Sequence, residues 1–451
     1  MNLYALLKSR EQQGRPVRVG VIGAGKFATM FLSQARHTPG MHISAVVDLF
    51  PDRACAALQQ VGWSSESICT AAAPTAFDHR VYVTDDVSTV LQADRLDVVV
   101  EATGDPIAGV HHALLCCDVG INIVMVNVEA DVLCGTALAY QARRAGLVYS
   151  LAYGDQPALI AEQVDWARAV GLEVVSAGKG TKYLPSYHAS TPDTVWEHYG
   201  ITPSGAAEAG MNPQMFNSFL DGTKSSIEMA AVANATGLKP PRDGLAFPPC
   251  GIAELPVKMK PRADGGVLHE SGMVEVVSSL NRDGSAIDDD LRWGVYVTFR
   301  ASSAYVARCF SQYGMNTDSS GQYAALHRPY HLIGLELGIS VASVALRGEA
   351  TASPVAFNGD VIAVAKRDLK SGETLDGEGG YTVWGRIYRA ADSIAMGGLP
   401  IGLAKDAALV RNLAAGEPVT WTDVRFDMDS EAVRTRREME QMFGPGRLQI
   451  A

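Results

Sequence analysis

The sequence predicts an α/β fold whose N-terminal part is a Rossmann-type, doubly wound parallel sheet. Three observations predict it: a glycine-rich turn after an apolar strand, an aspartate that closes the second strand, and an alternation of apolar strands with helical segments as far as about residue 150. The chain has 451 residues, too many for a single core and suited to about three domains. We therefore expect further domains of a different build after the first.

The first strand and the turn after it indicate the ligand of this domain. The apolar run 17–22 leads into Gly23-Ala24-Gly25-Lys26-Phe27-Ala28, and helical spacing continues to Arg36. A strand that turns through glycines into a helix leaves backbone N–H groups and the positive helix end facing one point, where a pyrophosphate can sit. The alternative is a βαβ unit that binds no nucleotide. The residues assigned to dinucleotide binding here are Gly23, Gly25, Lys26, Phe27 and Ala28.

Asp48 closes the second predicted strand, residues 43–47. It lies close to the offset of about 20 residues at which an acid holds the adenosine ribose. A carboxylate there repels a 2′-phosphate, so we expect NAD rather than NADP. Arg53, five residues later, favours NADP as the alternative. In a domain that binds no nucleotide, Asp48 would only cap a turn.

Two later apolar strands, residues 97–102 and 121–126, reach the same edge of the predicted sheet. Cofactors in such sheets lie across the carboxyl ends of the strands. We therefore place Thr103, Gly104 and Asn127 at the cofactor, with Glu129 at the same rim.

After Tyr153 the regular alternation ends and ionisable residues become frequent in predicted loops, so we expect the catalytic α+β domain there. Hydride transfer needs a proton shuttle and a cation that polarises the substrate oxygen. Lys179 is favoured because Gly178 and Gly180, in a predicted loop, would let the backbone approach a ligand; the alternative is a solvated surface lysine. The catalytic candidates are Lys179, Asp155, Glu129, Lys224 and Glu228.

Substrate contacts are expected from Lys182, His327 and Arg328. Residues 327–331 are predicted to open an apolar helix over 332–342, and an arginine in a first helical turn suits an anionic group. The alternative for residues 327–331 is that they only cap and pack this helix. The alternative for Lys224 and Glu228 is an exposed i,i+4 pair on a helix surface. A divalent cation held by Asp155, Glu129 and Glu228 is conceivable, but no spacing motif supports it, and no metal ligand is assigned.

Composition narrows the classes of partner. The formal net charge is −11, without a basic cluster, which disfavours nucleic acid. The seven cysteines form no C-x-x-C pair, which argues against a disulfide framework and a structural zinc site. No apolar run is long enough for a membrane span and no signal peptide is visible, so we expect a cytoplasmic protein. The expected partners are a small-molecule substrate and a second copy, as a dimer.

Several blocks of the chain together carry a resemblance. They resemble the homoserine dehydrogenase-like oxidoreductases, and more narrowly the branch with the 1-deoxy-D-xylulose 5-phosphate reductoisomerase-like enzymes. The resemblance covers most of residues 15–440 and implies a SAF-type module near the C-terminus. Two segments echo each other there, 365–373 and 408–417. The blocks are 17–28, 101–104, 127–131, 176–180, 221–237 and 327–331.

The chain also departs from these families. Homoserine dehydrogenases have a lysine directly after the rim asparagine, where this chain has Val128, and a catalytic lysine where Glu228 stands, so homoserine is an unexpected substrate. Asp48 replaces the small or basic residues that suit NADP in the reductoisomerase-like enzymes, and the run 181–188 differs after the shared lysine.

The resemblance and the residues together define the expected organisation and function. We expect a dinucleotide domain at 1–152, a catalytic and dimerisation domain at 153–353 and a small β-rich SAF-type domain at 354–451. The expected activity is NAD(P)-dependent oxidoreduction of a small sugar-derived polyol, hydroxy acid or phosphate, with a reductoisomerase step as an option. The alternative is a nucleotide-bound carbohydrate sensor without turnover.

Overall fold

The computed structural model describes residues 2–70, 79–92, 96–425 and 427–444. The chain forms two compact units. The first contains residues 1–159 and 331–354, and the second contains residues 160–330 and 355–451. The chain thus returns to the first unit at residues 331–354, the segment for which an apolar helix is predicted.

The first unit is built on a seven-stranded sheet in the order β3-β4-β2-β1-β5-β6-β7, with every neighbouring pair parallel. The chain leaves β1 on one side and returns on its other side at β5, which is the strand order of a doubly wound sheet. The predicted fold class is confirmed. The strands are β1 Val17–Ile22, β2 Met41–Val47, β3 Ile68–Cys69, β4 Val81–Thr84, β5 Val98–Glu101, β6 Asn122–Met125 and β7 Tyr149–Leu151.

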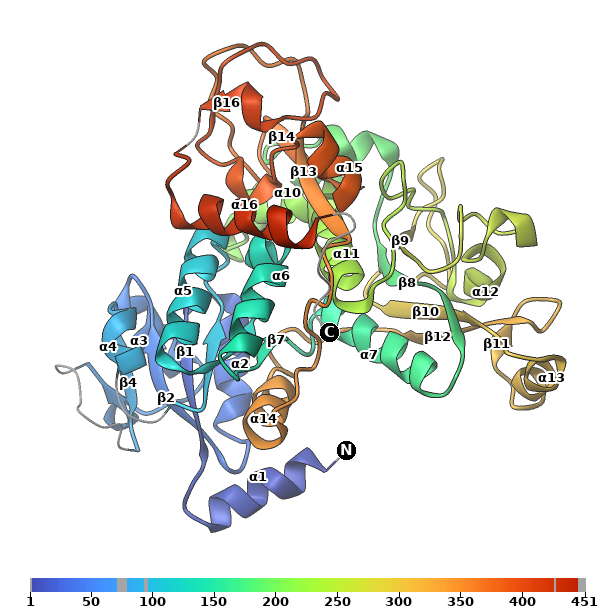
Figure 1. The fold of residues 1–451 in the computed structure, drawn as a ribbon. Helices are drawn as coiled ribbons and strands as arrows, with labels where there is room; N and C mark the ends of the chain where they lie inside the picture. The colour runs from blue at the N-terminus through green and yellow to red at the C-terminus, as the bar shows by residue number, and fades with distance from the viewer. Residues whose placement is uncertain (1, 71–78, 93–95, 426, 445–451) are drawn as a thin grey trace. The chain divides into compact units, whose positions relative to one another are not determined.

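Helices pack against this sheet because its strands are apolar on both faces. One face packs against α14, which contacts α1 and α2, and residues of all three helices join the core cluster of β1 and β2 (Figure 1). The helix α5, which follows β5, packs against α6, which follows β6. The helices are α1 Leu3–Gln12, α2 Lys26–Ala35, α3 Pro51–Gln60, α4 Val87–Gln92, α5 Pro106–Val119, α6 Val128–Arg144 and α14 Gly338–Arg347, with the 3-10 turn η1 Ser65–Ser67.

Three local expectations for this unit are wrong or fall outside the described residues. The sequence pattern predicts a helical insertion and loop over 61–80, but the structure has a turn, then η1 and the short strand β3, and residues 71–78 lie outside the described residues. The pattern also predicts a helix over 138–145, but α6 begins at Val128, ten residues earlier. The helix expected at 332–342 begins at Gly338, because Gly334 in the left-handed region (φ 72°) interrupts the preceding turns.

The second unit is built on a five-stranded mixed sheet in the order β11-β12-β10-β8-β9. Its central strand β10 is antiparallel to both β8 and β12, whereas β8 and β9 run parallel. The helix α11, Thr223–Thr236, contacts β8 and β9 and is buried along almost its whole length. The strands are β8 Glu173–Thr181, β9 Met273–Ser278, β10 Val295–Arg300, β11 Asn316–Thr317 and β12 Tyr323–Arg328.

Shorter helices complete this part of the unit, together with α7, in which the boundary between the two units falls. They are α7 Gln156–Ala169, α8 Val195–Tyr199, α9 Pro203–Glu208, α10 Pro213–Leu220, α12 Leu255–Lys258 and α13 Ala304–Gln312, with the 3-10 turns η2 Pro185–Ala189, η3 Ile252–Glu254 and η4 Arg262–Asp264.

The C-terminal segment of the second unit shows a local twofold repeat. Leu369 and Leu413 exchange both backbone hydrogen bonds, each at 2.9 Å. Around them Arg367 pairs with Glu373 at 2.8 Å, and Arg411 pairs with Glu417 at 2.7 Å, 44 residues later in the chain. The echo seen in the sequence is therefore a pair of equivalent turns packed against each other, which is compatible with an internal duplication.

The same segment contains β13 Gly359–Ala365 and β14 Val383–Arg389, which pair antiparallel and both contact α11. The last helix, α16 Glu431–Phe443, was expected to be a solvated amphipathic helix, but one face of it is buried. Arg436 is fully buried there and pairs with Asp360. The remaining elements are α15 Ala390–Met396, β15 Ala408–Leu409, β16 Val424–Arg425, η5 Ile401–Leu403 and η6 Trp421–Asp423.

Candidate functional site

The glycine turn of the first unit has the geometry that the sequence predicts for a phosphate cradle. Gly23 has φ 95°, a left-handed conformation that favours glycine, and an added Cβ would lie 2.6 Å from the carbonyl oxygen of Ala102. Gly25 is the N-cap of α2, and Gly25 and Lys26 are exposed. Phe27 packs partly against the core and Ala28 is fully buried. The exposed start of α2 is thus free of side-chain bulk at Gly25.

Asp48 follows β2 as predicted, but its carboxylate is turned inward, with 1% of the side chain exposed. Its Oδ2 accepts a hydrogen bond from the Ala24 amide at 2.8 Å, and its Oδ1 accepts one from the Phe50 amide at 2.9 Å. Arg53 donates to both oxygens at 2.7 Å. Burial alone would raise the pKa of Asp48, but these hydrogen bonds outweigh it and hold the pKa below its usual value. Asp48 therefore ties the glycine turn to the end of β2.

Arg53 is the solvent-exposed partner in its ion pair with Asp48. Its side chain is 58% exposed, and its guanidinium lies 5.3 Å from the ring centroid of Phe50, which is itself 62% exposed. A cation and an aromatic ring are therefore presented side by side at the end of β2.

The rims of β5 and β6 meet where the sequence places the cofactor. Thr103 and Gly104 are exposed directly after β5, and Gly104 adopts φ 74°. Asn127 is buried: its Oδ1 caps α6 by accepting from the Ala130 amide at 3.0 Å, and its Nδ2 donates to the Asp105 carbonyl at 2.7 Å. Asn127 thus fastens the two rims to each other rather than presenting its amide to solvent.

Glu129 and Asp155 belong to the same unit but to different local settings. Glu129 is half-buried in the first turn of α6, which is an element the sequence analysis read as a loop. Asp155 is half-buried at the start of α7, where its Oδ1 accepts from the Gln156 amide at 2.8 Å.

Lys179 lies in the second unit and is paired with Glu228, whereas the sequence analysis paired Glu228 with Lys224. The Nζ of Lys179 donates to Oε2 of Glu228, and the two side chains are 8% and 5% exposed. Lys179 comes from β8 and Glu228 from the buried helix α11. The alternative of a solvated surface lysine is wrong, because the ammonium is enclosed and ion-paired.

The expectation of a glycine-flanked loop around Lys179 is also wrong. Residues 173–181 form one continuous strand, β8, so both glycines are strand residues. A Cβ on Gly178 would lie 1.8 Å from the carbonyl oxygen of Glu275, and one on Gly180 would lie 2.1 Å from that of Leu291. The glycines therefore allow the protein's own backbone to approach, not a ligand.

Lys182 and Lys224 complete the predicted cations. Lys182 follows β8, donates to the carbonyl of His198, and has a pKa lowered by burial and by Arg292 nearby. Lys224 is half-buried in the first turn of α11, one turn before Glu228.

The start of α11 carries a second buried ion pair that the sequence analysis missed. Lys366, from the C-terminal segment, lies 2.8 Å from Oδ2 of Asp221, and the side chains are 2% and 0% exposed. The Lys366 ammonium also donates to the carbonyls of Ser190 and Gly380, at 2.8 and 2.7 Å. Asp221 precedes α11 and its Oδ1 accepts the Thr223 amide at 2.9 Å, so one buried pair lies at the start of this helix and the other, with Glu228, lies within it.

His188 lies beside Asp221 in an aromatic setting. It stacks on Trp384 with centroids 3.9 Å apart, and its Nδ1 is 2.6 Å from the Asp221 carbonyl oxygen. Because a carbonyl only accepts, Nδ1 carries the proton, and Nε2 faces the hydroxyl of Tyr183 at 2.9 Å. Burial lowers the pKa of His188, which keeps its ring neutral at pH 7.

A third buried acid, Glu275, lies within β9. Its carboxylate accepts the amides of Ala246, Phe247 and Val276, yet burial raises its pKa to about 7. Phe247 holds φ 48°, a left-handed conformation that is costly for a residue with a Cβ.

The predicted substrate residues His327 and Arg328 are placed differently from the expectation. They end β12 instead of opening a helix, so the anticipated helix N-terminus at Arg328 does not form. Arg328 lies 5.2 Å from the ring centroid of Tyr330, and burial lowers the pKa of His327.

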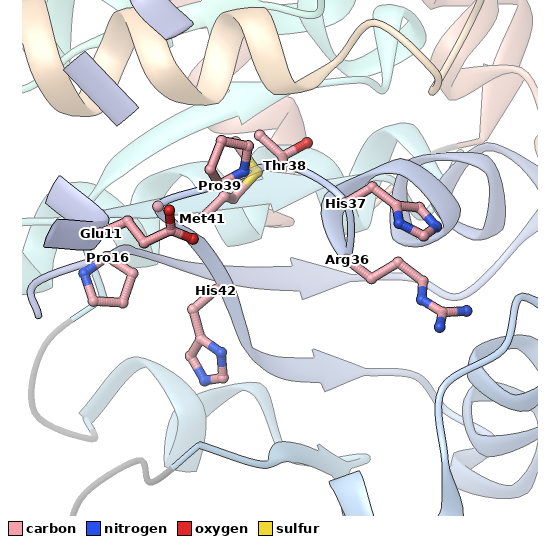
Figure 2. Close-up of a pocket in the computed structure, with 9 residues that line it drawn as sticks. Glu11, Pro16, Arg36, His37, Thr38, Pro39, Met41 and His42 are labelled. Atoms are coloured by element: carbon pink, nitrogen blue, oxygen red, sulfur yellow. The ribbon is translucent and has the colours of Figure 1, made fainter. Parts of the chain in front are cut away.

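A pocket of about 400 Å³ in the first unit lies at the amino ends of β1 and β2. Figure 2 shows Glu11 and Pro16 on one side of it and Arg36 and His37 on the other. It is at the opposite ends of these strands from the glycine turn and does not include the predicted cofactor residues. Over the described ranges, no three His, Cys, Asp or Glu side chains gather as a metal site. None of the described helices has the length and apolar character that a bilayer crossing requires.

Comparison with known proteins supports an oxidoreductase. Residues 154–337, which include Lys179, Lys182, Asp221, Lys224 and Glu228, match the family model described as Oxidoreductase DRL, catalytic domain. No protein of curated function matches the chain. The homoserine dehydrogenase-like and SAF-type features that the sequence resemblance implied have no counterpart among these matches.

Solved structures of dehydrogenases and reductases are similar to this chain at low identity. A probable dehydrogenase from Thermotoga maritima shares 12% identity over 74% of this chain and 90% of its own, with a TM-score of 0.38. A dipicolinate-bound dihydrodipicolinate reductase from Paenisporosarcina sp. TG-14 shares 12% over 73% and 95%, with a TM-score of 0.33. An oxidoreductase from Agrobacterium radiobacter, in complex with NAD+, L-tartaric acid and magnesium, shares 14% over 45% of this chain with a TM-score of 0.29, and only 54% of its length is spanned.

Proposed function

We infer that the protein, an NAD(P)-dependent oxidoreductase, acts on a small polar, sugar-derived substrate: a polyol, a hydroxy acid or its phosphate. The observation that carries the proposal is the buried pair of Lys179 and Glu228, within the segment that matches an oxidoreductase catalytic domain. A lysine held by a carboxylate can polarise a substrate oxygen and return a proton to it.

The nicotinamide cofactor is assigned to the glycine turn and the two rims of the first unit. Gly23, Gly25, Lys26, Phe27 and Ala28 would hold the pyrophosphate at the start of α2. The nicotinamide, which exchanges the hydride with the substrate, would lie against the rim formed by Thr103, Gly104 and Asn127. Lys182, Lys224, His327 and Arg328 remain candidates for substrate contacts, and Glu129 and Asp155 for proton transfer.

The experiment is a turnover assay on the purified full chain. The absorbance of the reduced nicotinamide is followed with a panel of polyols, hydroxy acids and their phosphates, and product analysis shows whether the carbon skeleton is rearranged before reduction. We expect turnover with at least one substrate and a loss of at least about 100-fold for Lys179→Met. A protein that binds dinucleotide but turns over no compound of the panel would favour the carbohydrate-sensor alternative.

Within this proposal, the residue that distinguishes NADP from NAD at the adenosine ribose is Arg53 rather than Asp48. NADP is then the preferred cofactor. The sequence prediction of NAD assumed that the Asp48 carboxylate faces the ligand. In the structure both carboxylate oxygens are occupied by Ala24, Phe50 and Arg53, whereas the guanidinium is 58% exposed. An exposed guanidinium suits a 2′-phosphate.

This choice is tested by the ratio of the NADP to the NAD dissociation constant. Arg53→Gln removes the phosphate contact and frees one acceptor position on each oxygen of Asp48, so the ratio should move toward NAD by about 10- to 100-fold. Asp48→Ser, which leaves the guanidinium, should change the ratio less. If Asp48→Ser shifts the ratio toward NADP more than Arg53→Gln shifts it toward NAD, Asp48 reads the ribose as first predicted.

The expected domains (1–152, 153–353 and a SAF-type 354–451), the dimer and the cytoplasmic location also remain proposals. Light scattering on the purified chain tests the dimer, and a monomer at micromolar concentration would contradict it. The local twofold repeat around Leu369 and Leu413 supports a compact C-terminal module.

A further inference from the structure

A buried acid lies directly beneath the rim assigned to the cofactor. Glu101 is the last residue of β5 and is fully buried. Its Oε1 accepts the hydroxyl of Thr103 at 2.5 Å and the Thr103 amide at 3.3 Å, and Nδ1 of His112 lies 3.2 Å away. Its Oε2 is also buried and has no hydrogen-bond partner among the described residues. One oxygen of this carboxyl group is therefore buried without a protein donor in the described part of the chain, which is costly for an acceptor.

The acid occupies the point where three parts of the predicted cofactor site meet. Glu101 stands opposite Ile22, the last residue of β1, and opposite Met125, the last residue of β6. The turn at Gly23 touches the backbone of Ala102, the next residue of the rim. In doubly wound sheets the ligand crosses the carboxyl ends of the strands at the point where the strand order reverses, which here lies between β1 and β5.

The local hydrogen bonds hold this rim in one arrangement. Thr103 gives its hydroxyl proton to Glu101, and its oxygen lies 3.4 Å from Nδ2 of Asn127. Asp105 caps α5 by accepting the Ala108 amide at 2.9 Å. These contacts engage Oε1 and leave Oε2 without a hydrogen-bond partner among the described residues, so a cationic group of a ligand at this rim would stabilise the carboxylate.

We propose that Glu101 is a positioning residue that places a negative charge under the nicotinamide ring and so favours the oxidised, cationic cofactor over the reduced, neutral one. The inference rests on the proposed function, because it needs the nicotinamide at this rim. A carboxylate kept from water acts through a low effective dielectric, so its attraction for a cationic ring is considerable over several ångströms. The reduced ring carries no charge and gains nothing from this carboxylate.

The test is the ratio of the dissociation constants of the oxidised and the reduced dinucleotide, measured on the full chain by calorimetry and by nicotinamide fluorescence. Glu101→Gln keeps the shape and an acceptor for Thr103 but removes the charge. We expect it to weaken binding of the oxidised form relative to the reduced form by about fivefold or more. A purely structural role of Glu101 would weaken both forms by the same factor and leave the ratio unchanged, which would overturn the proposal.

Two variants serve as controls. Asp118→Asn removes an exposed carboxylate from the far end of α5 and should leave the ratio unchanged. Thr103→Val removes the hydroxyl but keeps the charge of Glu101, so both affinities fall while the preference for the oxidised form persists. If Thr103→Val instead reproduces the ratio of Glu101→Gln, Glu101 acts only through the Thr103 hydroxyl and the proposal is wrong.

The unmodified protein decides the question if Glu101→Gln does not fold. Its oxidised dinucleotide should bind at least as tightly as the reduced one, and reduced dinucleotide bound tenfold more tightly would contradict the inference. Absence of any dinucleotide binding is a different result, because it overturns the proposed function itself.

Discussion

The two units each hold a carboxylate paired with a cation, and the pairs differ in which partner meets solvent. In the first unit Asp48 is enclosed while Arg53 is 58% exposed. In the second unit Lys179 and Glu228 are both enclosed, at 8% and 5%. An enclosed pair contributes to the protein's own stability and reactivity, whereas an exposed cation on an enclosed acid is available to a ligand. Both ion pairs join a carboxylate to a cation, but we expect substitutions to have different effects on stability and on ligand binding in the two units.

Breaking the enclosed pair should have the largest effect. Lys179→Met leaves Glu228 buried without its cation, so we expect the free energy of unfolding to fall by about 3 to 5 kcal/mol. Denaturant unfolding measures this, beside the loss of turnover. The double variant Lys179→Met with Glu228→Leu should regain most of the stability but no activity. A single variant as stable as the unmodified protein would mean that the pair is not enclosed in solution.

The pair of Lys366 and Asp221 extends the comparison within the second unit. Lys366→Met should lower the free energy of unfolding by about 3 kcal/mol, because Asp221 is fully buried. Adding Asp221→Asn should restore about half of this loss, since a neutral amide costs less to bury than a carboxylate. Thermal unfolding of the unmodified protein and the two variants checks the order, and equal stability of the single and double variants would contradict it.

Two buried acids that make no ion pair in the described part of the chain predict that stability falls as the pH rises. The pKa of Glu275 and that of Asp131 are each raised by burial to about 7. Each acid is then protonated in the folded protein but ionised in the unfolded chain between about pH 4.5 and 7, so stability falls as the pH rises through this window. We expect a loss of at most about 3 to 4 kcal/mol per group. Glu275→Gln and Asp131→Asn should each flatten the profile measured between pH 5 and 8, and an unchanged profile would refute the assignment.

The smallest effect on stability is expected at the open pair. Arg53→Gln leaves the enclosed Asp48 carboxylate without its cation but with the amides of Ala24 and Phe50 as donors, so the free energy of unfolding should fall by about 1 kcal/mol, less than for Lys179→Met. Denaturant unfolding at low ionic strength measures it. A loss above 2 kcal/mol would show that Arg53 holds the glycine turn in place, and the change in cofactor preference would then reflect damage to the turn.

Much of the first unit could be predicted because its signals are local. The period of apolar residues and the two glycines define β1, the turn and α2 within one stretch of chain, and Asp48 lies at the predicted strand end. The orientation of its carboxylate could not be predicted, since it depends on the Ala24 amide and on Arg53, neither of which the strand pattern specifies.

The second unit was predicted less well because its site depends on contacts between distant segments. Glycine and lysine are poor strand residues, so residues 178–182 resemble a loop, yet the close approach of the Glu275 carbonyl to Gly178 makes most of this stretch a strand. Lys366 meets Asp221 across 145 positions of sequence, a partnership without a spacing signal. Glu101 was read only as part of an apolar strand, although a single acid ending such a run is the signal that could have singled it out.

The ammonium of Lys366 has a consequence for how this polypeptide can be divided. It satisfies one carboxylate and two carbonyls drawn from separate stretches of the chain. A gene fragment that stops near residue 354 would remove this donor from the Ser190 carbonyl and from Asp221, and would leave a solitary anion just before the helix that also carries Glu228. Any shorter relative that works without the last hundred residues should therefore have exchanged that aspartate for an uncharged side chain.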